Sequence, residues 1–360
     1  MCTKAVYLSN ILINNSKTSV KNTLYESKRS LTTKLIYNNY GNPSDVVNKV
    51  TENTPEPGKN EVLIEILAAP INPVDINLIQ GKYPIKKPLP AVAGYEGTGR
   101  IIKLGEKVEK FQVGDHVIPV EYNLGTWRSH LLVHQNVLKK LPRDLPPAVA
   151  SILMVNPLTV YRMLKDFVTL QLGDTVIQNG SNSSCGQLVI QLCKFWGFKT
   201  INIVRSRENI DELKQELKKL GANYVLTEEE LRSTDLFKSG EIKKPNLGLN
   251  CIGGKSSSEL LRKLDYSGTL VTYGGMSTQP VTIPVSALIF KNIKFVGFNV
   301  NRWNANCSKE ERDRTLDELI SMFLNGQLTS PAYTSIHLDN FKEALHVGFS
   351  NKKYIFEIKK

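Results

Sequence analysis

The pattern of apolar and polar positions changes near residue 150 of the chain. Before that point, short apolar runs of strand type alternate with turns rich in Pro and Gly. The runs lie at residues 62–67, 99–104 and 117–120. Nine prolines fall between residues 43 and 119, and proline disfavours helix interiors. We therefore expect residues 35–155 to form a compact β-rich domain with many loops.

After residue 150, apolar strands alternate with amphipathic helical stretches. The predicted strands lie at residues 175–178, 200–204, 224–226, 247–252, 269–273 and 294–298, and the main helices at 186–196, 208–220 and 257–264. This alternation predicts a parallel sheet with helices on both faces, and six strands are typical of a doubly wound dinucleotide-binding fold. Two more helices, at residues 309–324 and 340–346, and a strand at 353–358 are predicted to follow.

The composition is that of a globular protein. Of its 360 residues, 41% are hydrophobic and 22% are charged. No apolar run reaches the roughly 20 residues that a membrane span requires, so we expect none. The five cysteines form no Cys-x-x-Cys pair, which argues against a disulfide framework and against a cysteine-rich zinc lobe.

The chain is basic, with 46 Lys and Arg against 34 Asp and Glu and a formal net charge of +12. Residues 1–34 hold six of the basic residues and only one acidic residue, and they are rich in Ser, Thr and Asn. This composition is typical of an organelle transit peptide, which we expect to be removed near residues 29–34; an ordinary tail is the alternative. The remaining chain is also basic, which leaves nucleic acid or an acidic protein open as partners.

A candidate phosphate loop, Asn-Gly-Ser-Asn-Ser-Ser-Cys-Gly, spans residues 179–186. It follows a predicted strand and opens a predicted helix, where backbone N–H groups and the helix dipole favour a pyrophosphate. With Gly186 as the third glycine of a dinucleotide fingerprint, Ser181 and Ser183 occupy the first two glycine positions. The alternative is a plain Ser/Asn turn, and the surrounding strand–helix alternation favours the cofactor loop.

The next predicted strand ends in Arg205, Ser206 and Arg207. A NAD-binding fold needs an Asp or Glu here for the ribose 2′-hydroxyl. Two guanidiniums and a hydroxyl instead suit a 2′-phosphate, which arginine binds in a bidentate, charge-assisted way. Because cations are disfavoured at the start of a helix, we prefer this interpretation to two solvated arginines and predict NADPH as the cofactor.

The first domain carries Asn-Pro-Val-Asp at residues 72–75 and Gly-Tyr-Glu-Gly at residues 94–97. Followed by a dinucleotide domain, this arrangement resembles the medium-chain dehydrogenase/reductase superfamily. Its zinc alcohol dehydrogenases have Gly-His-Glu where this chain has Tyr95, which removes a zinc ligand. No cysteine occurs between residues 3 and 184, and His130 and His134 have no neighbouring ligand set. We expect no catalytic metal.

Seven further segments, including Gln-Gly-Lys-Tyr at residues 80–83, resemble the mitochondrial 2-enoyl thioester reductases of fatty acid synthesis. They lie at residues 80–83, 125–128, 156–164, 176–179, 202–207, 250–257 and 271–276. Each segment alone is weak evidence for the family, but the seven together, in the family's order, are highly specific. The resemblance runs from about residue 35 to the end of the chain. It implies an α/β protein with a GroES-like β-rich catalytic domain at residues 35–155 and 303–360. A doubly wound six-stranded Rossmann domain at 156–302 is inserted into it, and residues 1–34 precede it as transit peptide.

The resemblance assigns roles to individual residues. Tyr83 corresponds to the family's proton donor. The implied cofactor contacts are Asn156, Asn182, Ser183, Ser184, Cys185, Arg205, Ser206, Arg207, Tyr273, Gly274, Gly275, Met276, Phe298, Asn299, Val300 and Lys353. Ser184 and Cys185 depart from the Gly and Val that are usual in the family, and we expect Cys185 to pack like Val rather than act as a nucleophile. For residues 298–300 and Lys353, packing or a solvated lysine is the alternative.

The implied activity is NADPH-dependent reduction of trans-2-enoyl thioesters of acyl carrier protein or coenzyme A in the mitochondrial matrix, the last step of each elongation cycle. Hydride would add to the β-carbon, and the phenol of Tyr83 would give a proton to the α-carbon. The resemblance also implies a homodimer through edge strands of the cofactor domains. The basic body suits an acidic acyl carrier protein as a transient partner.

Two other functions stay open. One is a zinc-free NADPH:quinone reductase of the same superfamily. The other is a crystallin-like or RNA-binding protein, which the scattered basic residues and the lack of an aromatic platform for single strands disfavour. Candidates for an acyl pocket, each also a candidate for the core, are Tyr95, Trp127, Phe290, Phe298 and Trp303.

Overall fold

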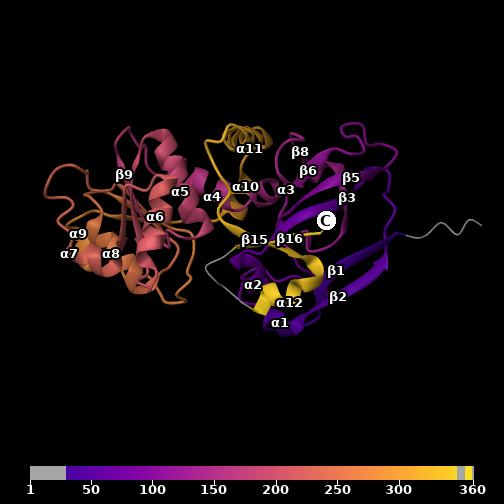
Figure 1. Cartoon of the computed structure of the whole chain (residues 1–360), viewed down its shortest axis with the longest axis horizontal. Helices are drawn as coiled ribbons and strands as arrows, with labels where there is room; N and C mark the ends of the chain where they lie inside the picture. Colours follow the sequence, from indigo (N-terminus) through magenta and orange to yellow (C-terminus); the bar gives the residue numbers. More distant parts are fainter. Residues whose placement is uncertain (1–29, 347–352, 359–360) are drawn as a thin grey trace, which may run out of the picture.

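Two lobes make up the molecule, with helices α4 (Asn156–Asp166), α10 (Val300–Asn306) and α11 (Lys309–Leu324) between them (Figure 1). The computed structural model describes residues 30–346 and 353–358. The expected transit peptide therefore lies, up to residue 29, outside the described residues. Within the described ranges, no helix has the length and apolar character needed to cross a bilayer.

The first lobe contains a seven-stranded sheet in which two strands from the C-terminal part of the chain join strands from its N-terminal half. Its strands are, in order, β15 (Tyr333–His337), β16 (Lys353–Glu357), β3 (Glu61–Pro70), β5 (Thr98–Leu104), β6 (His116–Pro119) and β8 (Leu138–Lys140), with β7 (His130–His134) also paired to β3. The three strands predicted before residue 150 are confirmed as β3, β5 and β6. The end of the chain returns to this lobe because β16 runs antiparallel to β3, with Ile355 opposite Pro70.

A three-stranded sheet completes this lobe. It contains β2 (Val47–Asn53), β1 (Leu31–Tyr37) and β4 (Ala91–Val92), in that order. The first residues of β1 fall in the segment that the sequence assigned to the leader. Yet β1 pairs with β2 from Leu31 onward, and Thr32 and Leu35 are buried. A boundary at residue 34 would divide this strand, so we propose that any leader ends before Leu31.

Short helices and helical turns close the first lobe. They are α1 (Pro43–Val46), α2 (Pro73–Ile79), α3 (Pro147–Ile152), α12 (Phe341–His346) and the 3₁₀ turns Gln135–Val137 and Leu338–Asn340. Helices α1, α2 and α3 each have proline in the first positions, where the missing N–H would have no helical partner. The prolines that disfavour long helices therefore begin several short ones.

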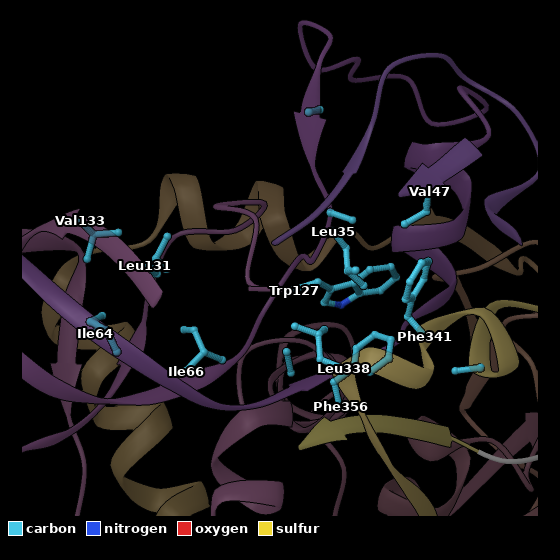
Figure 2. Close-up of a cluster of buried hydrophobic side chains, with 14 of the residues drawn as sticks. Leu35, Val47, Ile64, Ile66, Trp127, Leu131, Val133, Leu338, Phe341 and Phe356 are labelled. Atoms are coloured by element: carbon cyan, nitrogen blue, oxygen red, sulfur yellow. The ribbon is translucent and has the colours of Figure 1, made fainter. Parts of the chain in front are cut away.

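The core of the first lobe surrounds Trp127 (Figure 2). Trp127 is fully buried, its indole Nε1 donates to the Pro70 carbonyl at 3.1 Å, and its ring meets Phe356 edge-on with centroids 5.2 Å apart. Leu35 and Leu338 pack into the same cluster, so the beginning, middle and end of the chain meet here. Trp127 is thus a core residue, the second of the two roles for which the sequence made it a candidate.

The second lobe is a parallel sheet of six strands, all of which were predicted. Their spatial order is β11 (Tyr224–Thr227), β10 (Lys199–Val204), β9 (Thr175–Asn179), β12 (Leu247–Asn250), β13 (Thr269–Thr272) and β14 (Lys294–Gly297). The helices are α5 (Ser184–Trp196), α6 (Ile210–Leu220), α7 (Glu228–Ser233), α8 (Gly254–Lys263) and α9 (Val285–Ile289). Sequence order 3-2-1-4-5-6 is that of the doubly wound dinucleotide fold, which binds its ligand at the carboxyl ends of the strands where the order reverses. Here that place lies between β9 and β12.

Candidate active site

The turn from β9 to α5 has the geometry of a phosphate loop. Ser183 caps α5, and its hydroxyl accepts a hydrogen bond from the Gly186 N–H at 3.1 Å. A Cβ at Gly186 would lie 2.5 Å from the Ser181 carbonyl oxygen, so only glycine fits this position. The remaining first-turn N–H groups, among them those of Ser184 and Cys185, have no partner within the helix and are available to an anion.

The predicted 2′-phosphate residues lie at the carboxyl end of β10, next to this turn. The backbone joins the two segments, because the Ser181 N–H donates to the Ile203 carbonyl at 3.2 Å. Arg205 and Ser206 are exposed and Arg207 is half-buried. Within the described chain, neither arginine forms an ion pair; the Arg207 Nε reaches only the Arg205 carbonyl, at 3.5 Å. Two guanidiniums without a carboxylate partner therefore stand beside the phosphate loop.

The segment Tyr273–Met276 follows β13 and lies along the end of β12. The Tyr273 N–H donates to the Asn250 carbonyl and the Met276 N–H to the Cys251 carbonyl, both at 3.0 Å. Gly275 and Met276 are exposed, whereas the Tyr273 hydroxyl is buried against the Cys251 thiol. The exposed Gly275 and Met276 are therefore the residues of this segment that a ligand at this edge of the sheet could contact.

Lys353, at the start of β16, belongs to a hydrogen-bond network with two other predicted site residues, Asn156 and Cys185. Its Nζ donates to the Oδ1 atoms of Asn72, at 2.6 Å, and Asn156, at 2.9 Å. The Asn156 amide nitrogen in turn donates to the Cys185 sulfur at 3.5 Å. Cys185 packs with the apolar residues of the second lobe, and burial raises the pKa of its thiol to about 12. A thiol that stays protonated agrees with the expectation that Cys185 is no nucleophile.

Two buried carboxyl groups complete this network. Asn72 donates through its amide nitrogen to Glu96 at 2.8 Å, and the Val155 N–H donates to the other Glu96 oxygen at 2.9 Å. The Asn72 N–H donates to Asp75 at 2.8 Å in the capping box of α2. Burial raises the pKa of Glu96, while Lys353 opposes this effect; burial likewise lowers the pKa of Lys353. The lysine is therefore held rigidly at the junction of the lobes rather than solvated.

Tyr83 lies on the loop after α2, and its N–H donates to the Asn77 carbonyl at 3.1 Å. The side chain is half-buried, and its hydroxyl accepts a hydrogen bond from the Asn299 amide nitrogen at 3.2 Å. Asn299 follows β14, so this contact brings the two lobes together. Two residues that the sequence assigned to different parts of the site thus form one pair.

Tyr95 lies near this pair and is fixed from both sides. Gly94 has φ of +106°, and a Cβ there would lie 2.4 Å from the Trp127 nitrogen, so the chain can approach the core closely only with glycine. The Tyr95 ring stacks on Tyr122 with centroids 5.0 Å apart, and the Tyr122 hydroxyl donates to the Met154 carbonyl at 2.7 Å. Burial and then the nearby Tyr83 raise the pKa of Tyr95 well above its ordinary value, so its hydroxyl remains protonated.

Comparison with known proteins agrees with this architecture. Residues 58–143 match the alcohol dehydrogenase GroES-like domain, and residues 185–319 match the family described as zinc-binding dehydrogenase. The mitochondrial enoyl-acyl-carrier-protein reductase of Xenopus tropicalis is 48% identical over 317 residues, which cover 86% of this chain and 90% of that protein. The human enzyme of the same name is 45% identical over 317 residues, 87% of this chain and 84% of that protein. The chain belongs to the mitochondrial enoyl-acyl-carrier-protein reductases.

Solved structures separate this family from its nearest alternative. The Etr1p complex with NADP and crotonyl-CoA, and the 2-enoyl thioester reductase Etr1p/Etr2p heterodimer from Candida tropicalis, are each 34% identical and cover 91% of this chain and 100% of theirs, with TM-scores of 0.86 and 0.85. A quinone oxidoreductase of Escherichia coli is 21% identical, with a TM-score of 0.76 and the same coverage, a likeness of fold alone. The family is an oxidoreductase family with a mitochondrial location.

The residues at the position of the superfamily's zinc site do not fit a catalytic metal. Tyr95 replaces the expected histidine, and both oxygens of Glu96 already accept hydrogen bonds. In the described ranges, no group of three or more His, Cys, Asp and Glu side chains is arranged to hold a metal ion. His130 bonds the hydroxyls of Thr32 and Ser129, as expected for an ordinary histidine.

The four other aromatic candidates for an acyl pocket lie in different parts of the structure. Tyr95 is buried, Phe290 is 75% exposed on the second lobe, and neither lines the cavity that contains Asn299. Phe298 and Trp303 help line a cavity of about 360 Å³ that also includes Asn299. Phe298 meets Phe167 edge-on, with centroids 5.9 Å apart, and Val300 packs near Trp303, so packing accounts for the contacts of Phe298 and Val300 in this structure.

Three residues of the network were not singled out for the site from the sequence, namely Asn72, Asp75 and Glu96. A local signal existed for the first two, since Asn followed three residues later by Asp, with Pro between them, is the pattern of a helix start. Glu96 was noted only as part of a motif. Its contacts are made with residues 24 and 59 positions away, so no local pattern predicts them.

Proposed function

We infer that the protein reduces the double bond of trans-2-enoyl thioesters with NADPH in the mitochondrial matrix. The observation that supports this most directly is the Tyr83 phenol, held by Asn299 just beyond the last strand of the dinucleotide sheet. This arrangement supports a proton donor at the edge where doubly wound folds bind their cofactors. Membership of the enoyl reductase family supports the same activity.

The residues at the nucleotide turn fit NADPH. The close approach at Gly186 and the start of α5 suit a pyrophosphate, and the unpaired Arg205 and Arg207 suit a 2′-phosphate. Tyr273, directly after β13, is a further proposed contact. When bound, this cofactor supplies the hydride that adds to the β-carbon of the substrate. Asn182, Ser183, Ser184, Ser206, Gly274, Gly275 and Met276 remain proposed contacts on the same edge.

Reduction of an enoyl thioester leaves negative charge on the thioester oxygen and the α-carbon, and the α-carbon must gain a proton. We assign that proton to Tyr83: its O–H bond breaks, the electron pair stays on the phenol oxygen, and a C–H bond forms at the α-carbon. Solvent then returns a proton to the phenolate. A positioned acid of this kind typically contributes about 10²- to 10⁴-fold to the rate.

Lys353 and Asn156 would support this chemistry by holding the two lobes in register. Lys353 bonds Asn72 of the first lobe and Asn156 at the start of α4, and Asn156 contacts Cys185 of α5. These links fix the nucleotide turn relative to the loop that carries Tyr83. We propose the catalytic domain as Leu31 to residue 155 together with residues 303–360, and the cofactor domain as residues 156–302.

The substrate class follows from the family and from the cavity beside Asn299. Etr1p is known with crotonyl-CoA, a short enoyl thioester. We place the acyl chain in the cavity of about 360 Å³ lined in part by Phe298 and Trp303, because Asn299, which contacts Tyr83, lines it too. An acidic acyl carrier protein is proposed as the physiological carrier, since the chain that remains after removal of the leader is still basic and would attract it.

The test is oxidation of NADPH with crotonyl-CoA, compared with a quinone and with NADH. We expect turnover with crotonyl-CoA and NADPH and little with either replacement. Reduction of the quinone without reduction of crotonyl-CoA would overturn the proposal in favour of a quinone reductase. An RNA complex that salt dissociates, with no reductase activity, would instead favour the nucleic-acid alternative.

We also propose that the protein is a homodimer formed through the cofactor lobes. The edge strand β14 pairs only with β13 within the described chain, which leaves its other side open. The segment leading to β14 exposes a run of large apolar side chains, namely Ile283, Val285, Leu288, Ile289 and Phe290. Such a patch beside an open strand edge suits a second copy of the chain.

Phe290→Asp should therefore convert the dimer to a monomer, because a carboxylate in the apolar patch must be desolvated when the two copies meet. The measurement is molar mass by light scattering after size exclusion. Leu172→Asp is the matched control, since Leu172 is 81% exposed in the same lobe but lies before β9. A Phe290→Asp protein that keeps the mass of the dimer would place the interface elsewhere.

A further inference from the structure

We propose that Asn299 is a positioning residue for Tyr83: its amide donates to the phenol oxygen and so leaves the phenol proton available to the substrate. The inference rests on the proposed reductase activity and gives Asn299 a role other than cofactor contact. It concerns one contact, the 3.2 Å hydrogen bond from the Asn299 Nδ2 to the Tyr83 Oη. The two residues are 216 positions apart and come from different lobes.

The orientation of the Asn299 amide is set independently of Tyr83. Asn299 is the N-cap of α10, and its Oδ1 accepts a hydrogen bond from the Arg302 N–H at 2.9 Å. Because the oxygen faces the helix, the NH₂ group must face away from it, toward Tyr83. The cap thus ensures that Tyr83 meets a donor rather than an acceptor.

The backbone around Asn299 is held on both sides. The Phe298 N–H donates to the Thr272 carbonyl at 3.0 Å, which continues the sheet past β14. In α10, the Asn304 amide donates to the Val120 carbonyl of the first lobe at 2.9 Å. Asn299 therefore lies between a fixed strand end and a helix tied to the lobe that carries Tyr83, which keeps the amide in place without substrate.

The donor has two effects on a phenol that acts as an acid. Tyr83 accepts the bond from Asn299, so its own O–H is not spent on that neighbour. When the proton leaves, the N–H stabilises the negative charge that develops on the phenol oxygen, an interaction stronger in the transition state than before it. Tyr95 also hydrogen bonds with Tyr83, and this bond raises the pKa of Tyr95, so Tyr95 remains a protonated, neutral neighbour of the phenol oxygen.

Asn299→Asp is the most informative variant. Aspartate caps a helix as well as asparagine does, so α10 should persist, but it presents a carboxylate oxygen to Tyr83. The phenol must then donate to that oxygen, and its proton is withdrawn from the substrate. We expect kcat with crotonyl-CoA to fall about 10- to 100-fold, with the KM for NADPH and the melting temperature nearly unchanged.

Asn299→Ser and Ser308→Asp separate this effect from helix capping and charge. Serine keeps the cap but is too short to bridge to Tyr83, so kcat should fall about tenfold. Ser308 is the exposed N-cap of α11, where Asp adds the same charge at a neighbouring helix start and should leave kcat unchanged. If Asn299→Asp and Asn299→Ser both retain wild-type kcat, Asn299 is only a cap and the proposal is overturned.

A double-mutant cycle provides the second arm. In a Tyr83→Phe background, Asn299→Ser should cost no further activity, because the phenol oxygen that it serves is absent. Fully additive losses would overturn the proposal by showing that Asn299 acts elsewhere. Failure of the proposed function is distinguishable, because the wild-type enzyme itself would then show no turnover of crotonyl-CoA.

Discussion

Tyr83→Phe should lower kcat for crotonyl-CoA by about 10²- to 10⁴-fold while NADPH binds as before. The substitution removes one oxygen and keeps the ring, so the loop after α2 should fold normally. Within the described chain, the Tyr83 hydroxyl accepts a hydrogen bond from Asn299 and also hydrogen bonds with the Tyr95 hydroxyl, and both partners lie at the site itself. A fall in kcat would therefore reflect the loss of proton transfer. The measurements are kcat with crotonyl-CoA and, by calorimetry, the dissociation constant for NADPH, which should not change.

Tyr95 is the neighbouring phenol that could donate a proton in place of Tyr83. It hydrogen bonds with Tyr83, but it is 4% exposed and stacked on Tyr122. Its strongly raised pKa makes it a poor acid, since ionising it would bury a phenolate in apolar surroundings. We expect Tyr95 to supply little residual activity, which is why the predicted loss is large.

Tyr266→Phe is the matched control for this experiment. Tyr266 is 67% exposed, and the same oxygen is removed without touching the region between the lobes. It should retain wild-type kcat. Wild-type turnover in Tyr83→Phe would remove Tyr83 from the mechanism, whereas loss of NADPH affinity in that variant would show that Tyr83 instead shapes the cofactor site.

The second lobe was predicted almost completely because its signals are local. Each strand from β9 to β14 is a short apolar run, and α5 and α6 have one apolar face and end at Gly197 and Gly221. The first lobe was predicted less well. β1 contains alternating polar residues and lies next to the basic segment, so composition assigned its start to a leader. Its strand character comes from pairing with β2, which no short window contains.

The site residues also divide into those with a local sequence signal and those whose contacts join distant parts of the chain. The phosphate loop, Arg205 and Arg207 could be predicted because a βα turn and the end of the next strand are fixed points of the fold. The Lys353 network could not, since its hydrogen bonds join residues 281 and 197 positions apart. Tyr83 was found through a family motif, but its partner Asn299 emerges only when the two lobes are placed together.

Replacing both Arg205 and Arg207 with Gln should raise the KM for NADPH by about 10²- to 10³-fold and leave the KM for NADH nearly unchanged. Each charge-assisted hydrogen bond to a phosphate contributes about 1.5–3 kcal/mol, and only NADPH carries the 2′-phosphate that would receive them. Because neither arginine is paired with a carboxylate in the described structure, neutralising them leaves no buried charge behind. The fold should therefore persist, and the measurement is the ratio of kcat/KM for the two cofactors.

Lys218→Gln with Lys219→Gln supplies the charge-matched control for that double substitution. Both lysines are exposed in the last turn of α6, the helix that follows the arginines, so the same two charges are removed from the same lobe. This control should keep the wild-type preference, since general attraction to an anionic cofactor is screened over about 8–10 Å at physiological salt. If the control raises the KM for NADPH as much as the arginine variant does, the preference for NADPH comes from the long-range electrostatic field of the lobe and not from a direct contact. If wild-type enzyme uses NADH as well as NADPH, the 2′-phosphate assignment of Arg205 and Arg207 fails, because a clamp for that phosphate must discriminate between the two.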